Sequence, residues 1–307
     1  MDIVKLINYM ENLRYERKLS QEEYLYNIIS QRQYYRYRYG ESEAPFEVVS
    51  KLAERLQIPL LKIITQYSDD SEKGKKLVQQ YFNLVISKKS AEAESIFLKI
   101  NDNNMIDEDS RTLAKLGKIL SDYNRRYFSK IELCALLKEN MHFKEIMQRN
   151  SLHDFELYLL GLLMEYSQPD RDIILEKLIY LFDNKKVLLG GNILYITQAY
   201  FWIIKNLGRT NRFKEVILFA QNAIDYCRDE FSYYCLEYFH YYKSLAHQNL
   251  EEIECFRDEL YNAITICMYY LPEKREKFFS QIQIDLEINP REFYQQFNHR
   301  INEKLNC

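Results

Sequence analysis

Glycine and proline are scarce in this chain, and their scarcity limits the possible folds more than any other feature of the sequence. The 307 residues include only 7 glycines and 5 prolines. Sheet-rich chains of this length need many turns, and tight turns depend on both residues. Most segments instead repeat apolar residues at intervals of three and four, which is the period of a helix with one buried face. We therefore predict an all-α fold.

The composition predicts a protein that stays out of the membrane. Hydrophobic residues make up 47% of the chain, which is enough for a substantial core. No apolar run approaches the roughly 18 residues that a membrane span needs. The stretch MDIVKLINYMENLRYERK at the start lacks the uninterrupted apolar segment of a signal peptide. We therefore expect a cytoplasmic protein without membrane contacts.

The cysteines and histidines form no pattern typical of a metal site or a disulfide framework. The six cysteines include no CxxC pair, and the five histidines are scattered. Cys255 is one of four cysteines that cluster with His240 and His247 in the sequence, but the separations match no zinc knuckle. No phosphate loop, GxSxG elbow or HExxH motif occurs either. We predict no metal, no cofactor and no enzymatic activity.

The segment 1–67 shows start and stop signals of five short helices. Ser20 precedes QEEYLYNII, with Glu23 three residues later, which is the capping-box arrangement at a helix start. Ser30 can cap the following helix, and Gly40 can end it because glycine tolerates the left-handed conformation. The polar stretch 68–76 that follows is typical of a linker.

The third helical segment is basic and aromatic. SQRQYYRYRYGES, residues 30–42, holds three arginines and four tyrosines. Its side chains at helical spacing can project together from the N-terminal half of a helix, where arginine pairs with guanine and glutamine with adenine. Flanking polar residues can hold phosphates. The alternative is a solvated charged face. The predicted DNA-contacting residues are Ser20, Gln21, Gln31, Arg32, Gln33, Tyr35, Arg36 and Arg38.

The run LSQEEYLYNIISQRQYYRYRYGES resembles the Xre/Cro-type helix-turn-helix domain. The segment 19–23 matches the LSQEE opening, Arg36 matches the central arginine of the recognition helix, and 40–42 matches the ending of Rgg-like members. The turn lacks its usual glycine, and Arg38 replaces a common glutamate. The resemblance implies that the helix after Ser30 enters the major groove of double-stranded DNA.

Residues 77–307 continue as amphipathic segments of about three turns each, typical of helical hairpins. YFWIIKNLG from Tyr200 is echoed by YFHYYKSLA from Tyr238 at an offset of 38, and NAI at 222–224 recurs at an offset of 40. The stretch 211–225 resembles the second helix of a tetratricopeptide repeat, and Gly161 fits the glycine of an earlier first helix. We predict a right-handed, TPR-like solenoid that ends in a capping or dimer-forming helix.

Such an array curves into a groove that binds an extended peptide or a partner helix. In the tetratricopeptide register, two Phe-Lys pairs fall on the groove side, where phenylalanine can pocket an apolar side chain and lysine can meet a carboxylate. Two asparagines can bond a peptide backbone. The alternative places the phenylalanines in the core and the lysines in solvent. The predicted peptide-binding residues are Phe201, Lys205, Asn222, Phe239, Lys243 and Asn262.

The whole architecture resembles the RRNPP family of Rgg-, PlcR- and PrgX-like receptors, although only the motif at 19–42 is specific. The resemblance implies an intracellular homodimeric transcription regulator that binds operator DNA and a short signalling peptide. Two other readings stay open. One is a TPR-like protein adaptor whose N-terminal domain serves for assembly, and the other is an enzyme built on a helical scaffold.

Overall fold

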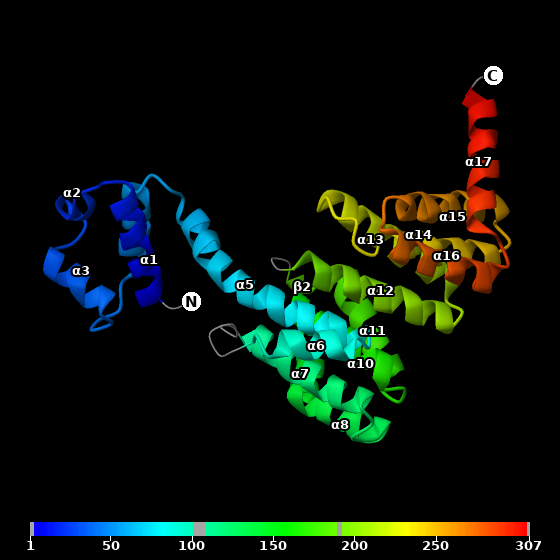
Figure 1. The fold of residues 1–307 in the computed structure, drawn as a ribbon, viewed down its shortest axis with the longest axis horizontal. Helices are drawn as coiled ribbons and strands as arrows, with labels where there is room; N and C mark the ends of the chain where they lie inside the picture. Colours follow the sequence, from blue (N-terminus) through cyan, green and yellow to red (C-terminus); the bar gives the residue numbers. More distant parts are fainter. Residues whose placement is uncertain (1–2, 101–107, 189–191, 306–307) are drawn as a thin grey trace. The chain divides into compact units, whose positions relative to one another are not determined.

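The computed structural model describes residues 3–100, 108–188 and 192–305, and within these ranges the fold is helical, as predicted (Figure 1). The chain divides into two compact units, Met1–Tyr127 and Phe128–Cys307. In the described ranges, no helix combines the length and the apolar character required to cross a bilayer.

The first unit begins with the five helices that the sequence predicts. They enclose a core in which Leu6, Met10, Tyr24, Tyr34 and Leu52 are fully buried. The helices of this unit are α1 (Ile3–Glu16), α2 (Gln21–Leu25), α3 (Gln31–Arg38), α4 (Phe46–Arg55), α5 (Leu60–Ile86), α6 (Ser90–Phe97) and α7 (Glu108–Asn124).

The predicted helix ends are confirmed. The hydroxyl of Ser20 accepts a hydrogen bond from the Glu23 amide at 3.1 Å, and the Glu23 carboxylate accepts from the Ser20 amide at 2.9 Å. Ser30 accepts from the Gln33 amide at 3.2 Å. Gly40 adopts φ 73°, and the following amide donates back to the Arg36 carbonyl at 2.9 Å, which closes α3 in the left-handed manner that favours glycine.

The polar stretch 68–76, which the sequence predicts to be a linker, is helical. It lies inside α5, which runs for 27 residues. The stretch contains no proline and a single glycine, so nothing in it stops a helix, and its lysines and glutamate are good helix formers. The functional division into domains 1–67 and 77–307 stays a prediction.

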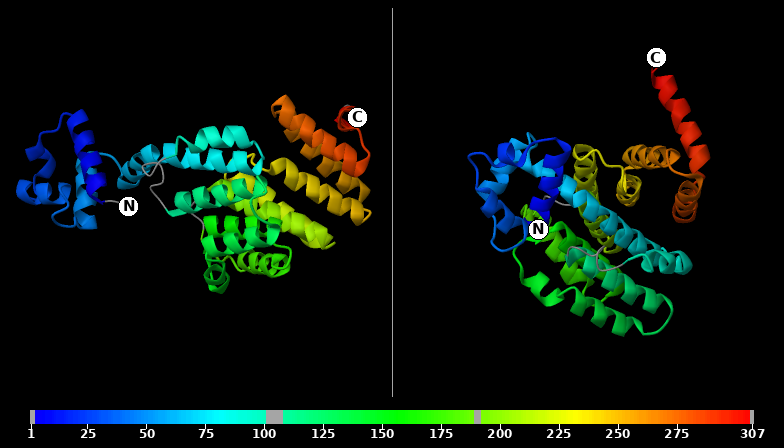
Figure 2. Two further views of the ribbon diagram at one scale, coloured as in Figure 1. Left: turned by 60° about the horizontal axis from the view of Figure 1, so that its bottom comes forward. Right: turned by 60° about the vertical axis from the view of Figure 1, so that its left-hand side comes forward.

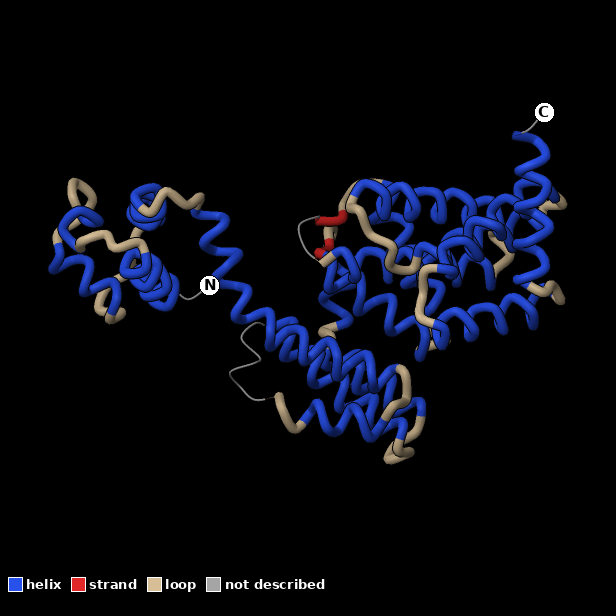
Figure 3. The backbone as a smooth tube through the Cα atoms, turned by 45° about the horizontal axis from the view of Figure 1, so that its top comes forward, coloured by secondary structure: helices blue, strands red, loops and turns tan. Residues whose placement is uncertain are grey.

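The second unit is a series of helical hairpins, as predicted. It comprises α8 (Lys130–Asn140), α9 (Phe143–Gln148), β1 (Leu152–His153), α10 (Asp154–Tyr166), α11 (Arg171–Asp183), β2 (Val187–Leu188), α12 (Ile193–Arg209), α13 (Phe213–Asp229), α14 (Leu236–Asn249), α15 (Ile253–Met268), α16 (Pro272–Leu286) and α17 (Pro290–Leu305). The two short strands pair in parallel and are drawn in red in Figure 3.

Alternate helices of this unit form two layers, and Figure 2 shows its hairpins following one another in chain order from green through yellow to red. The helices α10, α12 and α14 pack side by side, and α13 packs against both α12 and α14. The C-terminal helix α17 covers α15, where the Tyr261 ring stacks on Tyr294 and Phe297 with ring centroids 5.3 and 4.6 Å away. This alternation is the packing of tetratricopeptide-like hairpins.

Gly161 lets α10 and α12 approach closely. A Cβ atom at this position would overlap the ring of Trp202. The ring of Trp202 is 5% exposed and also contacts the Tyr158 ring, with centroids 5.3 Å apart. The glycine predicted for a repeat helix therefore has a packing role, because no larger residue fits here without displacing the indole.

The turns of the hairpins α12–α13 and α14–α15 have the same backbone structure at positions that are 40 residues apart. The Arg212 amide donates to the Leu207 carbonyl at 3.0 Å, and the Glu252 amide donates to the His247 carbonyl at 2.9 Å. The residues just before these amides, Asn211 and Glu251, have φ angles of 58° and 61°. The NAI echo at offset 40 is therefore in structural register.

The longer similarity, between the nine-residue segments that start at Tyr200 and Tyr238, has an offset of 38 and so differs from this register by two residues. Each residue turns a side chain by about 100° around the helix axis, so two residues turn it by about 200°. Phe201 of α12 and Phe239 of α14 consequently face different sides of their helices. Phe201 is partly exposed, whereas Phe239 is fully buried.

Candidate functional site

One side of α3 is exposed and polar, and the other side is buried. Gln31, Arg32, Tyr35 and Arg36 line a hollow of 560 Å³ together with Glu41. Arg36 and Glu41 are 3.9 Å apart and both exposed, so this ion pair is weak and leaves the guanidinium available. Two tyrosines of the same helix point into the core. The structure thus brings together four of the predicted DNA-contacting residues.

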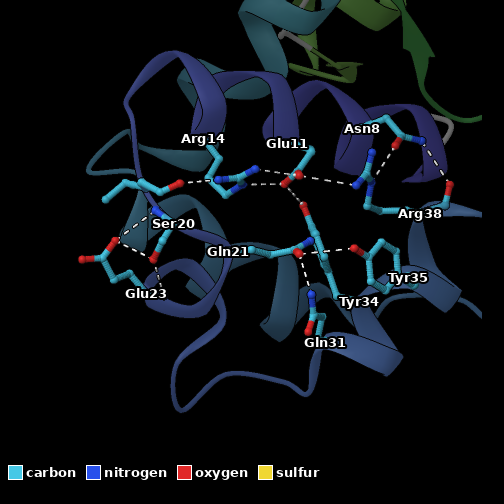
Figure 4. A network of polar contacts seen from close by, with 11 residues as sticks. Asn8, Glu11, Arg14, Ser20, Gln21, Glu23, Gln31, Tyr34, Tyr35 and Arg38 are labelled. Carbon is cyan, nitrogen blue, oxygen red and sulfur yellow. Dashed lines mark hydrogen bonds and ion pairs between the residues drawn. The ribbon is translucent and has the colours of Figure 1, made fainter.

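Gln21 connects the start of α2 to this exposed side of α3. Its side-chain oxygen accepts hydrogen bonds from the Gln31 amide group at 2.8 Å and from the Tyr35 hydroxyl at 3.3 Å (Figure 4). Shared contacts of this kind hold side chains in one geometry before a ligand arrives. Gln21 therefore belongs to the same surface. We call Gln21, Gln31, Arg32, Tyr35 and Arg36 the α3 surface.

The buried side of α3 is anchored to α1 by a polar network (Figure 4). The Glu11 carboxylate accepts from the Tyr34 hydroxyl at 2.9 Å, from Arg14 at 2.8 Å and from Arg38 at 3.4 Å. Arg38 also donates to the Asn8 side-chain oxygen at 3.0 Å, and Asn8 donates back to the Arg38 carbonyl at 3.1 Å. These contacts fix the direction in which α3 presents its exposed side.

The Glu11 carboxyl is charged in this network. Burial acts to raise its pKa, but hydrogen bonds from Arg14 and Tyr34 and the charges of Arg14 and Arg38 outweigh burial and lower the pKa. Sequence analysis did not single out Asn8, Glu11 or Arg14. The only signal was polar side chains between the core positions of α1, and it does not identify their partners.

The other three predicted DNA-contacting residues, Ser20, Gln33 and Arg38, serve the local structure rather than the α3 surface. The Ser20 hydroxyl belongs to the capping box. Gln33 donates to the Ser42 hydroxyl at 3.2 Å. Arg38 is directed to α1, and its side chain is 24% exposed. The structure therefore places Arg38 with the anchor of α3 rather than with the exposed side.

Phe201 and Lys205 lie on a partly exposed surface formed by α10, α12 and α14. The Lys205 ammonium is 2.9 Å from the Glu165 carboxylate and 5.6 Å from the centre of the Phe201 ring. The Phe201 ring packs edge to face on Tyr238 and Tyr242, with centroids 5.3 and 5.9 Å apart. Arg209 lies 3.9 Å from the same Glu165. We call Glu165, Phe201, Lys205, Arg209, Tyr238 and Tyr242 the α12 surface.

The second Phe-Lys pair does not join this surface, so the prediction that it lines the same face is wrong. Phe239 is fully buried. Lys243 donates to Gln221 of α13 at 2.8 Å and to Glu259 of α15 at 2.6 Å, so it faces the other layer of helices. The cause is the two-residue error in register. The predicted Asn222 and Asn262 are exposed on α13 and α15.

The ion pair of Lys243 is part of a largely buried cluster with His240. The His240 ring nitrogen Nδ1 is 2.6 Å from the Glu259 carboxylate. Burial acts to raise the pKa of Glu259, but hydrogen bonds from His240 and Lys243 outweigh it and lower the pKa. This cluster joins α13, α14 and α15, and its lysine is already paired within the protein.

A helix-turn-helix domain followed by tetratricopeptide-like hairpins defines the class of fold. No protein-family model matches the chain, and no curated protein matches it. Solved structures do match. Bacillus thuringiensis PlcR, in complex with the peptide PapR7 and DNA, has 17% sequence identity and a TM-score of 0.68 over 91% of this chain and 98% of that chain.

Two further solved structures show the same likeness. ComR from S. thermophilus, in complex with DNA and its signalling peptide ComS, has 13% identity and a TM-score of 0.62, with 91% of this chain and 98% of that chain covered. The Streptococcus dysgalactiae SHP pheromone receptor Rgg2 has 14% identity and a TM-score of 0.58, with 95% and 99% covered. The predicted RRNPP-like architecture is confirmed as the fold.

Proposed function

We propose that this protein is a cytoplasmic, homodimeric transcription regulator that binds operator DNA and responds to a short signalling peptide. The observation that carries the proposal is the α3 surface, an exposed group of glutamine, arginine and tyrosine side chains on a helix anchored from behind by Glu11. PlcR and ComR, which share the fold, were solved with both DNA and a peptide. The protein is a binding protein rather than an enzyme.

The α3 surface suits the edges of bases in a major groove. Arg32 and Arg36 carry planar guanidinium groups that pair bidentately with guanine, and Gln31 has the donor and acceptor that match adenine. A single short helix reads only half of a site, so two copies related by a twofold axis are needed for a symmetric operator. This requirement is the basis for proposing a homodimer.

The α12 surface suits a peptide that brings an apolar side chain and a charged group. Three aromatic rings are partly exposed there, so an apolar peptide side chain can cover them and exclude water from them. Lys205 and Arg209 share one carboxylate, Glu165, so a peptide carboxylate can take the place of Glu165 beside them. Phe201 and Lys205 therefore stay in the proposed site, whereas Phe239 and Lys243 leave it.

Binding to DNA from the promoter upstream of the protein's own gene tests the proposal. Fluorescence anisotropy should show sequence-specific binding whose affinity falls steeply with salt, because phosphate contacts release counterions. Arg36→Ala should weaken specific binding by about 1 to 3 kcal/mol, since one bidentate base contact is lost. Arg228→Ala, which removes the same charge from an exposed position of α13, is the matched control.

Wild-type protein that binds operator and unrelated DNA equally would contradict the proposal and favour the adaptor. If wild type binds the operator specifically and Arg36→Ala stays within twofold of its affinity, only the assignment of α3 as the recognition helix would be contradicted. The two results separate the function of the protein from the identity of the helix that carries it.

A further inference from the structure

Three side chains with metal-binding atoms meet at the turn between α14 and α15. A ring nitrogen of His247, a carboxylate oxygen of Glu252 and the sulfur of Cys255 all lie within 4.8 Å of one another. The His247 Nδ1 atom is 2.5 Å from Glu252. Atoms bound to one tetrahedral zinc ion are about 3.5 Å apart, given zinc–ligand bonds of about 2.0 to 2.3 Å. The separations here differ from that value by about 1 Å, and the exposed side chains of Glu252 and Cys255 have rotamer freedom to adjust around the His247 ring.

The backbone at this turn is already fixed. Besides the Glu252 amide bond to the His247 carbonyl, the amide of Leu250 donates to the Ala246 carbonyl at 3.1 Å and that of Glu251 to the Gln248 carbonyl at 3.1 Å. His247 is 8% exposed, so its ring has little freedom. The Glu252 side chain is 49% exposed and Cys255 is exposed, which leaves an open path for an ion.

The preceding hairpin has a charged pair at the equivalent positions. At the offset of 40, Glu252 corresponds to Arg212 and Cys255 to Glu215, and the two N-cap residues have closely similar dihedral angles, φ −84° and ψ 56° for Arg212 and φ −89° and ψ 70° for Glu252. Arg212 forms a bidentate ion pair with Glu215, in which its Nε and Nη2 atoms lie 2.7 and 2.5 Å from the two carboxylate oxygens. A cation and an anion therefore pair at the start of α13, and the same arginine also pairs with Glu176 of α11.

The same two positions in α14–α15 hold a carboxylate and a thiol, neither of which supplies a cation. We propose that a zinc ion supplies it, bound by His247, Glu252 and Cys255 with water in the fourth position. Imidazole, carboxylate and thiolate are all zinc ligands, and the two anionic ligands neutralise the dication. Binding would convert the Cys255 thiol to a thiolate, with release of its proton.

The zinc ion would tie the end of α14, through His247, to the start of α15, through Glu252 and Cys255. This inference goes beyond the proposed function and does not depend on it. Sequence analysis missed the site because it compared cysteines and histidines with zinc-knuckle spacings, and one of the three ligands is a glutamate. The turn, rather than a repeated motif, brings the ligands together.

Zinc binding to the full-length chain tests the inference. Protein stripped with a chelator and titrated with zinc against a chromophoric competitor should bind one ion per chain. Cys255→Ser should weaken binding by about tenfold or more, since a soft thiolate ligand is lost. Because Cys255 is exposed, this variant should fold normally, as circular dichroism can check. His247→Asn should have the same effect on zinc binding.

Cobalt provides the second readout. The wild-type cobalt protein should show a thiolate-to-cobalt charge-transfer band that Cys255→Ser abolishes. Cys134→Ser and His142→Asn, which alter a cysteine and a histidine elsewhere in the unit, should keep both the band and the zinc affinity. No zinc bound by wild type at micromolar concentration, or equal affinity in Cys255→Ser, would overturn the proposed site.

Discussion

Replacing Glu11 should both destabilise the first unit and release α3. The Glu11 side chain is 12% exposed and accepts hydrogen bonds from Arg14, Tyr34 and Arg38. A hydrogen bond to a charged group contributes about 1.5 to 3 kcal/mol, but both arginines can regain water and the Arg38 contact is long. We therefore expect Glu11→Ala to cost about 2 to 4 kcal/mol, and Glu11→Gln, which keeps the volume and one acceptor, about half of that.

Differential scanning calorimetry measures this loss. At about 4 °C for each kcal/mol in a unit of this size, Glu11→Ala should lower the melting temperature by about 8 °C or more. Glu16→Gln, at an exposed position of the same helix, should stay within about 0.5 kcal/mol of wild type. If Glu11→Ala also stayed within that margin, the network would not anchor α3 and the reasoning would be refuted.

The stability that Glu11 contributes should be fully present above its usual pKa of 4.5 and should be lost as pH falls through its lowered pKa in the folded protein. In calorimetry at decreasing pH, the difference in melting temperature between wild type and Glu11→Gln should therefore disappear. Gly161→Ala should cost about 1 to 3 kcal/mol in chemical denaturation, because the added methyl group overlaps Trp202; an unchanged midpoint would contradict that contact. Lys205→Ala should weaken binding of a cognate peptide by about 1 kcal/mol or more in calorimetry, whereas Lys243→Ala should leave it unchanged; unchanged affinity in Lys205→Ala would remove the α12 surface from the proposed peptide site. Light scattering should report a dimer on operator DNA, and a monomer on that DNA would contradict the proposal that two copies bind a symmetric operator.

Features that depend on neighbouring residues could be predicted from the sequence. The capping box at Ser20 and the left-handed end at Gly40 involve partners within about one helical turn, and such contacts depend on local residue types. The exposed side of α3 follows from helical spacing alone. For the same reason the helices themselves were predictable from the period of the apolar residues.

Features that depend on distant residues could not be predicted from the sequence. Glu11 meets Tyr34 and Arg38 across 23 and 27 residues, and nothing in α1 alone identifies those partners. The groove prediction failed at Phe239 and Lys243 because it aligned α12 with α14 by a nine-residue sequence similarity at an offset of 38. The true register is set by the hairpin turns, where the backbone hydrogen bonds of Leu207 and His247 repeat at an offset of 40.

The contact between Gly161 and Trp202 also limits how this protein can evolve. A methyl group at 161 overlaps the indole, and a smaller residue at 202 leaves a void between α10 and α12. Each single change is therefore costly, whereas a paired change can conserve volume. Among descendants of this chain, the two positions should covary: a larger residue at 161 should occur with a smaller one at 202, and the present pair should persist wherever either residue is kept.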